Sequence, residues 1–159
     1  MAAIEFTVNG RTVRVAMPAS VPLLDVLRDH LDLKGARYGC GLEQCGSCTV
    51  LLDGEPIYAC SREIGAAAGR RVVTIEGLGS AAQPHPLQWA FLDEQAGQCG
   101  YCLSGIILRA KALLDRNPSP TRSDIGQALD NNLCRCGAHP RILRAVEKAA
   151  GMLREGNGR

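Results

Sequence analysis

In the first half of the chain, apolar and polar residues alternate over short segments that glycine-containing turns separate. This alternation is typical of strands with one buried face, and Asn9-Gly10 and Asp53-Gly54 are two-residue hairpin turns. Strands are therefore predicted over residues 4–8, 13–15, 49–52, 56–60 and 72–75. One helix is predicted among them, because leucines recur at helical spacings over residues 23–31, with Ser20 as cap and Gly35 soon after its end.

The second half of the chain has the apolar period of helices. It follows a polar connector, residues 76–86, that glycine, serine and proline punctuate. Helices are predicted over residues 87–95 and 103–114, from about residue 121 to 129, and from about residue 140 to 153. The run 121–124 resembles a capping box at the start of the third helix. The pattern predicts an α+β protein with an N-terminal unit (residues 1–75), a linker (76–84) and a C-terminal bundle of four helices (85–159).

Composition narrows the class of protein. The chain has 159 residues, 46% of them hydrophobic, and a net charge of +2. This near-neutral balance, with few and scattered aromatic residues, predicts no nucleic-acid partner. The N-terminus has no secretory pattern, and the most apolar stretch, residues 102–114, is too short and too charged to be a transmembrane segment. The sequence therefore predicts a cytoplasmic protein, with membrane association only through partner subunits.

The eight cysteines divide four and four between the two halves. In the first set, four and two residues separate the first three members, and eleven more precede the fourth: Cys40, Cys45, Cys48 and Cys60. This is the C-x4-C-x2-C…C spacing of plant-type 2Fe-2S sites. Gly39, Gly41 and Gly46 allow a loop that bends tightly around two irons, and the loop amides are expected to point at the cluster. Spacing and glycines together predict a 2Fe-2S site.

The second set combines a C-x2-C at a predicted helix start with a C-x-C between two predicted helices: Cys99, Cys102, Cys134 and Cys136. If residues 133–137 are extended, both thiolates of the C-x-C face one target and Arg135 faces elsewhere. A pair of cysteines on each of two loops closes a four-sulfur site. Zinc sites with four cysteine ligands use the same pairing, so spacing alone leaves zinc open beside an iron-sulfur cluster.

Other uses of the cysteines fit the pattern less well. Disulfides suit an even count, but the expected cytosolic compartment and the tight Gly-Cys loops oppose them. A thiol-disulfide redox pair at residues 99–102 lacks the βαβ surroundings of such motifs. A c-type haem is excluded, because Thr49 and Leu103 stand where its histidine would follow each C-x2-C. The alternative function is a zinc-stabilised protein-interaction module.

Three runs of residues resemble the small iron-sulfur subunit of the molybdenum hydroxylases, the xanthine oxidase family. They are Tyr38-Gly-Cys-Gly-Leu-Glu-Gln-Cys-Gly-Ser-Cys-Thr-Val50, Gly97-Gln-Cys-Gly-Tyr-Cys102 and Asn132-Leu-Cys-Arg-Cys-Gly137. The resemblance follows the chain in order, uses all eight cysteines and favours iron over zinc. It implies a β-grasp ferredoxin-like domain that holds an outer cluster on the first set and a four-helix domain that holds an inner cluster on the second.

The resemblance also implies partners. Members of this family work beside a large subunit that holds molybdenum on a molybdopterin and oxidises the substrate. Electrons would leave the large subunit through the inner cluster and then the outer cluster. The resemblance thus implies that this chain is one subunit of an oxidoreductase and has no catalytic residue of its own. Gln98 and Cys136 correspond to residues that the family places beside the pterin. The three histidines are expected to be structural: His30, His85 and His139.

Two departures from the family's common pattern resemble the branch of isoquinoline and nicotinate dehydrogenases and related aldehyde dehydrogenases. Glu43 stands where glycine is frequent, and residues 137–139 replace a frequent Thr-Gly. In this branch electrons commonly pass to cytochrome c rather than to a flavin subunit. The runs 76–80 and 84–86 look closest to nicotinate dehydrogenase, which implies an N-heteroaromatic substrate such as nicotinate, or an aldehyde. Glu43 is expected at positive φ and is expected to lower the potential of the outer cluster.

Overall fold

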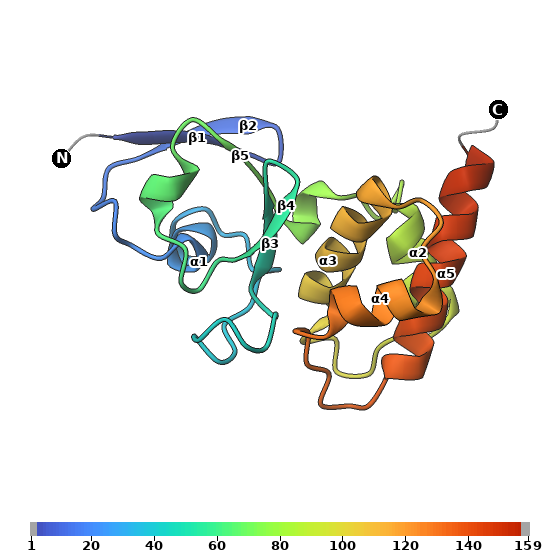
Figure 1. Ribbon diagram of the computed structural model, residues 1–159. Helices are drawn as coiled ribbons and strands as arrows, with labels where there is room; N and C mark the ends of the chain where they lie inside the picture. Colours follow the sequence, from blue (N-terminus) through green and yellow to red (C-terminus); the bar gives the residue numbers. More distant parts are fainter. Residues whose placement is uncertain (1–2, 157–159) are drawn as a thin grey trace.

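The computed structural model describes residues 3–156 and shows an α+β protein in two halves (Figure 1). The first half carries a mixed sheet of five strands in the order β2-β1-β5-β3-β4. The strands are β1 (Ile4–Val8), β2 (Arg11–Val15), β3 (Thr49–Leu52), β4 (Glu55–Tyr58) and β5 (Arg71–Val73). The predicted α+β class is therefore confirmed.

Two hairpins and one parallel pairing build the sheet. The hairpins turn at Asn9-Gly10 and Asp53-Gly54, as predicted, and all four turn residues have positive φ. This backbone conformation matches the twist of the flanking strands. β5 joins the hairpins, parallel to β1 and antiparallel to β3. Beneath the sheet, Phe6, Leu27 and Ile64 lie in one buried core.

The predicted leucine helix forms, but its start and geometry differ from expectation. Its first turn, α1 (Leu23–Asp25), begins directly after Pro22 and no side chain caps it, so the expected cap at Ser20 is wrong. The chain enters the helix from an extended bridge between Pro22 and Glu63, which leaves Ser20 outside it. The helix continues as a π-helix, η1 (Val26–His30). Adjacent residues, rather than a single stripe, are buried along it.

Four longer helices follow, as predicted. They are α2 (Pro86–Asp93), α3 (Leu103–Arg116), α4 (Arg122–Leu129) and α5 (His139–Gly156). α2 packs on α5 and α3 packs on α4 around a second buried core. The capping box is confirmed: Thr121 Oγ1 accepts the Asp124 N–H at 3.2 Å, and Asp124 Oδ2 accepts the Thr121 N–H at 2.8 Å. Within residues 3–156, no helix combines the length and apolarity needed to cross a membrane.

Two short 3-10 helices have no predicted counterpart. They are η2 (Ile64–Ala67) and η3 (Ile75–Gly77). Segments of three or four residues are too short to show an apolar period, so the sequence pattern could not indicate them.

The two halves meet where α3 lies against β3 and β4 (Figure 1). Leu51 packs there against Leu108 and Ala112. The approach is closest at Gly105, where an added Cβ would lie 2.1 Å from the carbonyl oxygen of Gly46. No side chain fits in that space, so glycine at position 105 allows the helix to contact the cysteine-bearing loop directly.

The histidine between two prolines has a structural role, as expected. His85 is the N-cap of α2: its Nδ1 accepts the N–H of Leu87 at 3.1 Å, and Gln88 Oε1 accepts the His85 N–H at 2.9 Å. Burial lowers the pKa of His85, the nearby Lys111 acts in the same direction, and Asp115 opposes them. A neutral imidazole is therefore favoured, which is the form that can accept a hydrogen bond.

His85→Ala is expected to destabilise the chain by about 1 kcal/mol through loss of the cap. The pKa of His85 is lower in the folded chain than its ordinary value of 6.5. The cap therefore contributes fully to the free energy of unfolding above pH 6.5, and this contribution is lost as the pH falls through the folded-state pKa. Thermal unfolding at several pH values checks this. His85→Asn keeps an acceptor that does not titrate in this range, so the native chain should lose stability relative to it below about pH 6.5. A constant difference would contradict the role of the imidazole.

Candidate metal centres

The loops that carry the cysteines lie at one edge of the molecule. Three of them precede β3, α3 and α5, carry all the cysteines except Cys60, and appear in cyan, yellow and orange at the bottom of Figure 1. In the first loop, Gly39 packs directly on a thiol, since an added Cβ would lie 2.6 Å from Cys45 Sγ. Gly46 has φ 74. Both positions exclude a larger residue without distortion, which explains the glycines between the cysteines.

Amide groups of this loop point at its sulfur atoms. The N–H groups of Leu42 and Gln44 each donate to Cys40 Sγ at 3.3 Å, and the N–H of Cys40 donates to Cys45 Sγ at 3.4 Å. Burial acts to raise the pKa of Cys40, but the amide hydrogen bonds outweigh it and lower the pKa to about 7. The loop therefore stabilises a thiolate, the form of cysteine that binds metals.

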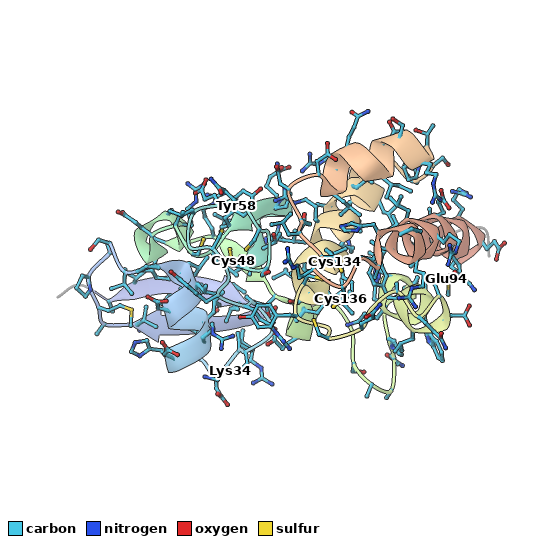
Figure 2. The ribbon with its side chains drawn as sticks, turned by 90° about the horizontal axis from the view of Figure 1, so that it is seen from below. Lys34, Cys48, Tyr58, Glu94, Cys134 and Cys136 are labelled. Carbon is cyan, nitrogen blue, oxygen red and sulfur yellow. The ribbon has the colours of Figure 1, made fainter. Side chains whose placement is uncertain are left out.

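The other two thiols of the first set lie at the open end of the β3–β4 hairpin. Cys48 precedes β3, Cys60 follows β4, and the Ala59 N–H donates to the Cys48 carbonyl at 3.3 Å. Figure 2 shows Cys48 beneath Tyr58 of β4. Burial, together with the neighbouring Cys60 thiol, raises the pKa of Cys48 to about 12. A metal would replace the proton that this environment retains.

The second set also forms two pairs, each of which joins the loop before α3 to the loop before α5. The Cys136 side chain influences the pKa of Cys99, and the Cys134 side chain that of Cys102, so each thiol has its neighbour on the other loop. Figure 2 shows Cys134 and Cys136 next to each other in the helical half. The expectation that a cysteine pair on each loop closes one four-thiol set agrees with this arrangement.

The C-x-C segment differs from expectation. The N–H of Gly137 donates to the carbonyl of Cys134 at 3.3 Å, so residues 134–137 form a tight turn and the predicted extended conformation is wrong. Gly137, the last residue of the turn, has φ 74, and glycine is favoured at this position of the turn. Arg135 and Cys136 both line one cavity beside this turn.

In the second set, as in the first, burial raises the pKa of one thiol and amide groups lower the pKa of another. Burial and the Cys134 thiol raise the pKa of Cys102 to about 12. The pKa of Cys99 is lowered, first by the Tyr101 amide, whose N–H donates to its Sγ at 3.5 Å. Each set therefore contains a deep, uncharged thiol and a shallow one that the backbone prepares as a thiolate.

The donor set fits a pair of two-iron clusters. All eight cysteines are free thiols, and they lie in four pairs. A 2Fe-2S centre takes four thiolates, two for each iron. Each set provides two pairs of cysteines, which is one pair for each iron. Within residues 3–156, no three His, Cys, Asp or Glu side chains gather around a point that suits a single metal ion.

The two sets approach each other closely. A cavity of about 220 Å³ is lined by cysteines of both sets: Cys40, Cys45, Cys99, Cys102 and Cys136. Beside it, the N–H of Leu133 donates to the carbonyl of Cys45 at 3.0 Å. Because Leu133 is bonded to Cys134, one hydrogen bond links the backbone of the first set to that of the second.

Asn132 reinforces this link, and sequence reasoning missed its role. The residue is 5% exposed, and its Nδ2 donates to the carbonyl of Gly46 at 3.3 Å. The same carbonyl accepts the hydroxyl of Thr49 at 2.8 Å and lies against Gly105. The only sequence signal for Asn132 is its place two residues before the C-x-C motif, which does not reveal a partner 86 residues away.

Glu43 has the backbone conformation expected from the sequence, with φ 59. It lies between Leu42 and Gln44, the two amide donors to Cys40. The hydroxyl of Ser61 donates to its carboxylate, so Glu43 also connects the first loop to the residue after Cys60. Its negative charge is thus held beside the first thiol set.

Glu43→Gln is expected to raise the reduction potential of the outer cluster by on the order of tens of millivolts, because it removes a negative charge but keeps an acceptor for Ser61. Redox titration followed by EPR checks this. Glu155→Gln removes an exposed charge at the end of α5 and should leave the potential unchanged. Equal potentials in the native and Glu43→Gln chains would contradict the effect.

Gln98 lies beside the second set, in an exposed groove. Its Nε2 donates to the carbonyl of Cys136 at 3.3 Å. The groove has a volume of about 620 Å³, and Phe91, Leu103 and Arg141 also line it. This placement leaves the amide oxygen of Gln98 available to a group that approaches the second set from outside. Of the other histidines, His30 ends η1 and His139 begins α5.

Fold and site together define a class: a protein with two iron-sulfur domains, one on a sheet and one among helices. The family of the 2Fe-2S iron-sulfur cluster binding domain matches residues 6–71, and that of the [2Fe-2S] binding domain matches residues 74–147. The chain therefore carries two 2Fe-2S clusters, and the zinc alternative is wrong.

Known proteins define the class further. A nicotinate dehydrogenase subunit from Pseudomonas putida is 54% identical over 92% of this chain and 94% of its own length. The alpha subunit of isoquinoline 1-oxidoreductase from Brevundimonas diminuta is 49% identical over 92% of this chain and 97% of its own. The crystal structure of aldehyde oxidoreductase from Desulfovibrio desulfuricans superposes with a TM-score of 0.94 at 40% identity, over 98% of this chain but only 17% of that longer chain. This chain belongs to the iron-sulfur subunits of the molybdenum hydroxylases, the xanthine oxidase family of oxidoreductases.

Proposed function

We propose that the chain relays electrons from the molybdopterin centre of a separate large subunit to an external acceptor. When bound, its two 2Fe-2S clusters supply the one-electron carriers. The outer cluster is assigned to Cys40, Cys45, Cys48 and Cys60, and the inner cluster to Cys99, Cys102, Cys134 and Cys136. The observation that carries the proposal is the grouping of the cysteines into two sets, with members of both lining one cavity.

The chain's own residues hold the two clusters together and offer the inner one to the partner. The Leu133–Cys45 and Asn132–Gly46 hydrogen bonds fix one cysteine loop against the other. Gln98 is proposed to contact the pterin of the partner through its free amide oxygen. The Nε2 of Gln98 donates a hydrogen bond to the Cys136 carbonyl. A contact between Gln98 and the pterin would therefore connect the pterin to the backbone of an inner-cluster ligand.

The proposed domains are a β-grasp ferredoxin-like domain (residues 1–75), a linker (76–84) and a four-helix bundle (85–159). The two separate apolar cores support this division, since one gathers residues of the sheet half and the other gathers residues of α2 to α5. The large partner is supported by the longer aldehyde oxidoreductase chain, in which the matching region is 17% of the length.

The proposed electron acceptor is cytochrome c, in preference to a flavin subunit. The proposed substrate is an N-heteroaromatic compound such as nicotinate, with an aldehyde as the second choice. The names of the similar nicotinate and isoquinoline enzymes support the substrate class. A cytoplasmic location belongs to the same proposal, because eight free thiols in cluster-binding loops suit a reducing compartment.

Anaerobic addition of nicotinate to the purified complex of this chain with its large subunit tests the proposal. The visible absorption of both clusters should bleach, and cytochrome c should then restore it. Oxidation of nicotinate without bleaching would contradict the relay. Restoration of the absorption by a flavin subunit but not by cytochrome c would contradict the acceptor.

A further inference from the structure

Arg109, in the middle of α3, carries a partly buried charge that forms no ion pair with any residue from 3 to 156. Its Nε and Nη2 atoms are buried without a hydrogen-bond partner among residues 3–156. The other two cations inside α3 are paired: Lys111 with Asp115, and Arg116 with Glu55 of β4. Arg109 therefore differs from its neighbours on the same helix.

The guanidinium group of Arg109 lies over an aromatic ring of the sheet half. Its central carbon is 5.1 Å from the centroid of the Tyr58 ring. Tyr58 lies two residues before Cys60 and pairs across the hairpin with Thr49, the residue after Cys48. The charge is thus held over the strand ends from which Cys48 and Cys60 extend.

Even partial burial of a cation has a cost unless a negative group compensates it, and a ring face offsets only part of that cost. No carboxylate within residues 3–156 forms an ion pair with Arg109. The thiolates of Cys48 and Cys60 belong to a cluster with net negative charge, which increases when the cluster accepts an electron. A fixed positive charge nearby stabilises the reduced form more than the oxidised form.

We infer that Arg109 raises the reduction potential of the outer cluster and so favours the transfer of electrons from the inner cluster to the outer one. The inference rests on the proposed assignment of the first cysteine set to the outer cluster. Arg109 does not touch the thiols in this arrangement; it acts through its charge, and Tyr58 positions it.

Redox titration of the full chain, followed by EPR, tests the inference. The EPR signal that is absent from a Cys60→Ser chain identifies the outer cluster. In Arg109→Met the midpoint of that signal should shift downward while the inner-cluster midpoint stays in place. Arg109→Lys keeps the charge and should retain most of the native potential. Arg109→Gln provides a second neutral variant if the methionine variant does not fold.

The matched control is Arg116→Met, which removes an exposed, ion-paired charge from the same helix and should shift the outer-cluster midpoint less than Arg109→Met does. An unchanged outer-cluster midpoint in Arg109→Met or Arg109→Gln would overturn the inference. Equal shifts in both clusters, or a lysine variant that behaves like the methionine variant, would overturn it as well. Failure of the cluster assignment itself would be distinguishable, because Cys60→Ser would then leave both EPR signals in place.

Discussion

Cys136→Ser is expected to remove the inner cluster and leave the outer one, so that iron falls from about four to about two atoms per chain. The Cys136 thiol is paired with that of Cys99 in the helical half, and the first cysteine set is held by its own loop amides. A serine hydroxyl is a harder and poorer ligand for an iron-sulfur centre than a thiolate. Metal analysis and EPR of the reduced chain measure both effects.

The reciprocal variant is Cys60→Ser, which changes a thiol of similar, intermediate exposure in the other half. It should remove the outer cluster alone. In the complete complex, Cys136→Ser should also block reduction of the outer cluster by substrate, although a small chemical reductant still reduces it. If either variant loses both EPR signals, the division of the cysteines into two independent sites is wrong.

Local spacing determines which parts of the fold and of the candidate sites can be predicted from the sequence. The C-x4-C-x2-C run and its glycines indicated the outer loop, because a loop that bends around metal needs both within a few residues. The hairpins at Asn9-Gly10 and Asp53-Gly54 and the helices of the second half were also predictable. Turn residues and apolar periods are local signals, and the structure confirms them.

Contacts between distant segments were not predictable in this way. The C-x-C run was expected to be extended because its cysteines are two apart, but the turn closed by Gly137 depends on how Cys134 and Cys136 reach Cys102 and Cys99. The π-helix after α1 likewise has no signal in the leucine spacing. Asn132 and Gly105 become informative only when the halves are placed together, since both contact Gly46.

Gly105→Ala is expected to destabilise the chain by about 1–3 kcal/mol, the usual cost of overpacking a well-packed interior. The added methyl group would lie 2.1 Å from the Gly46 carbonyl oxygen, and backbone cannot move aside as a flexible side chain can. α3 must therefore shift away from the outer-cluster loop. The same movement would stretch the Asn132–Gly46 hydrogen bond. Thermal unfolding of the cluster-loaded chain measures the loss of stability.

Gly126→Ala is the matched control, because Gly126 is also within a helix but has nothing within 4 Å of the position that a Cβ would take. There alanine should stabilise α4 by up to about 1 kcal/mol, through its better helix propensity. The same propensity acts at Gly105, so the difference between the two variants isolates the clash with Gly46. EPR adds an independent measure: weaker magnetic coupling between the reduced clusters in Gly105→Ala would show that the helix sets their separation. A Gly105→Ala chain as stable as Gly126→Ala would mean that α3 does not contact the cysteine loop in this way.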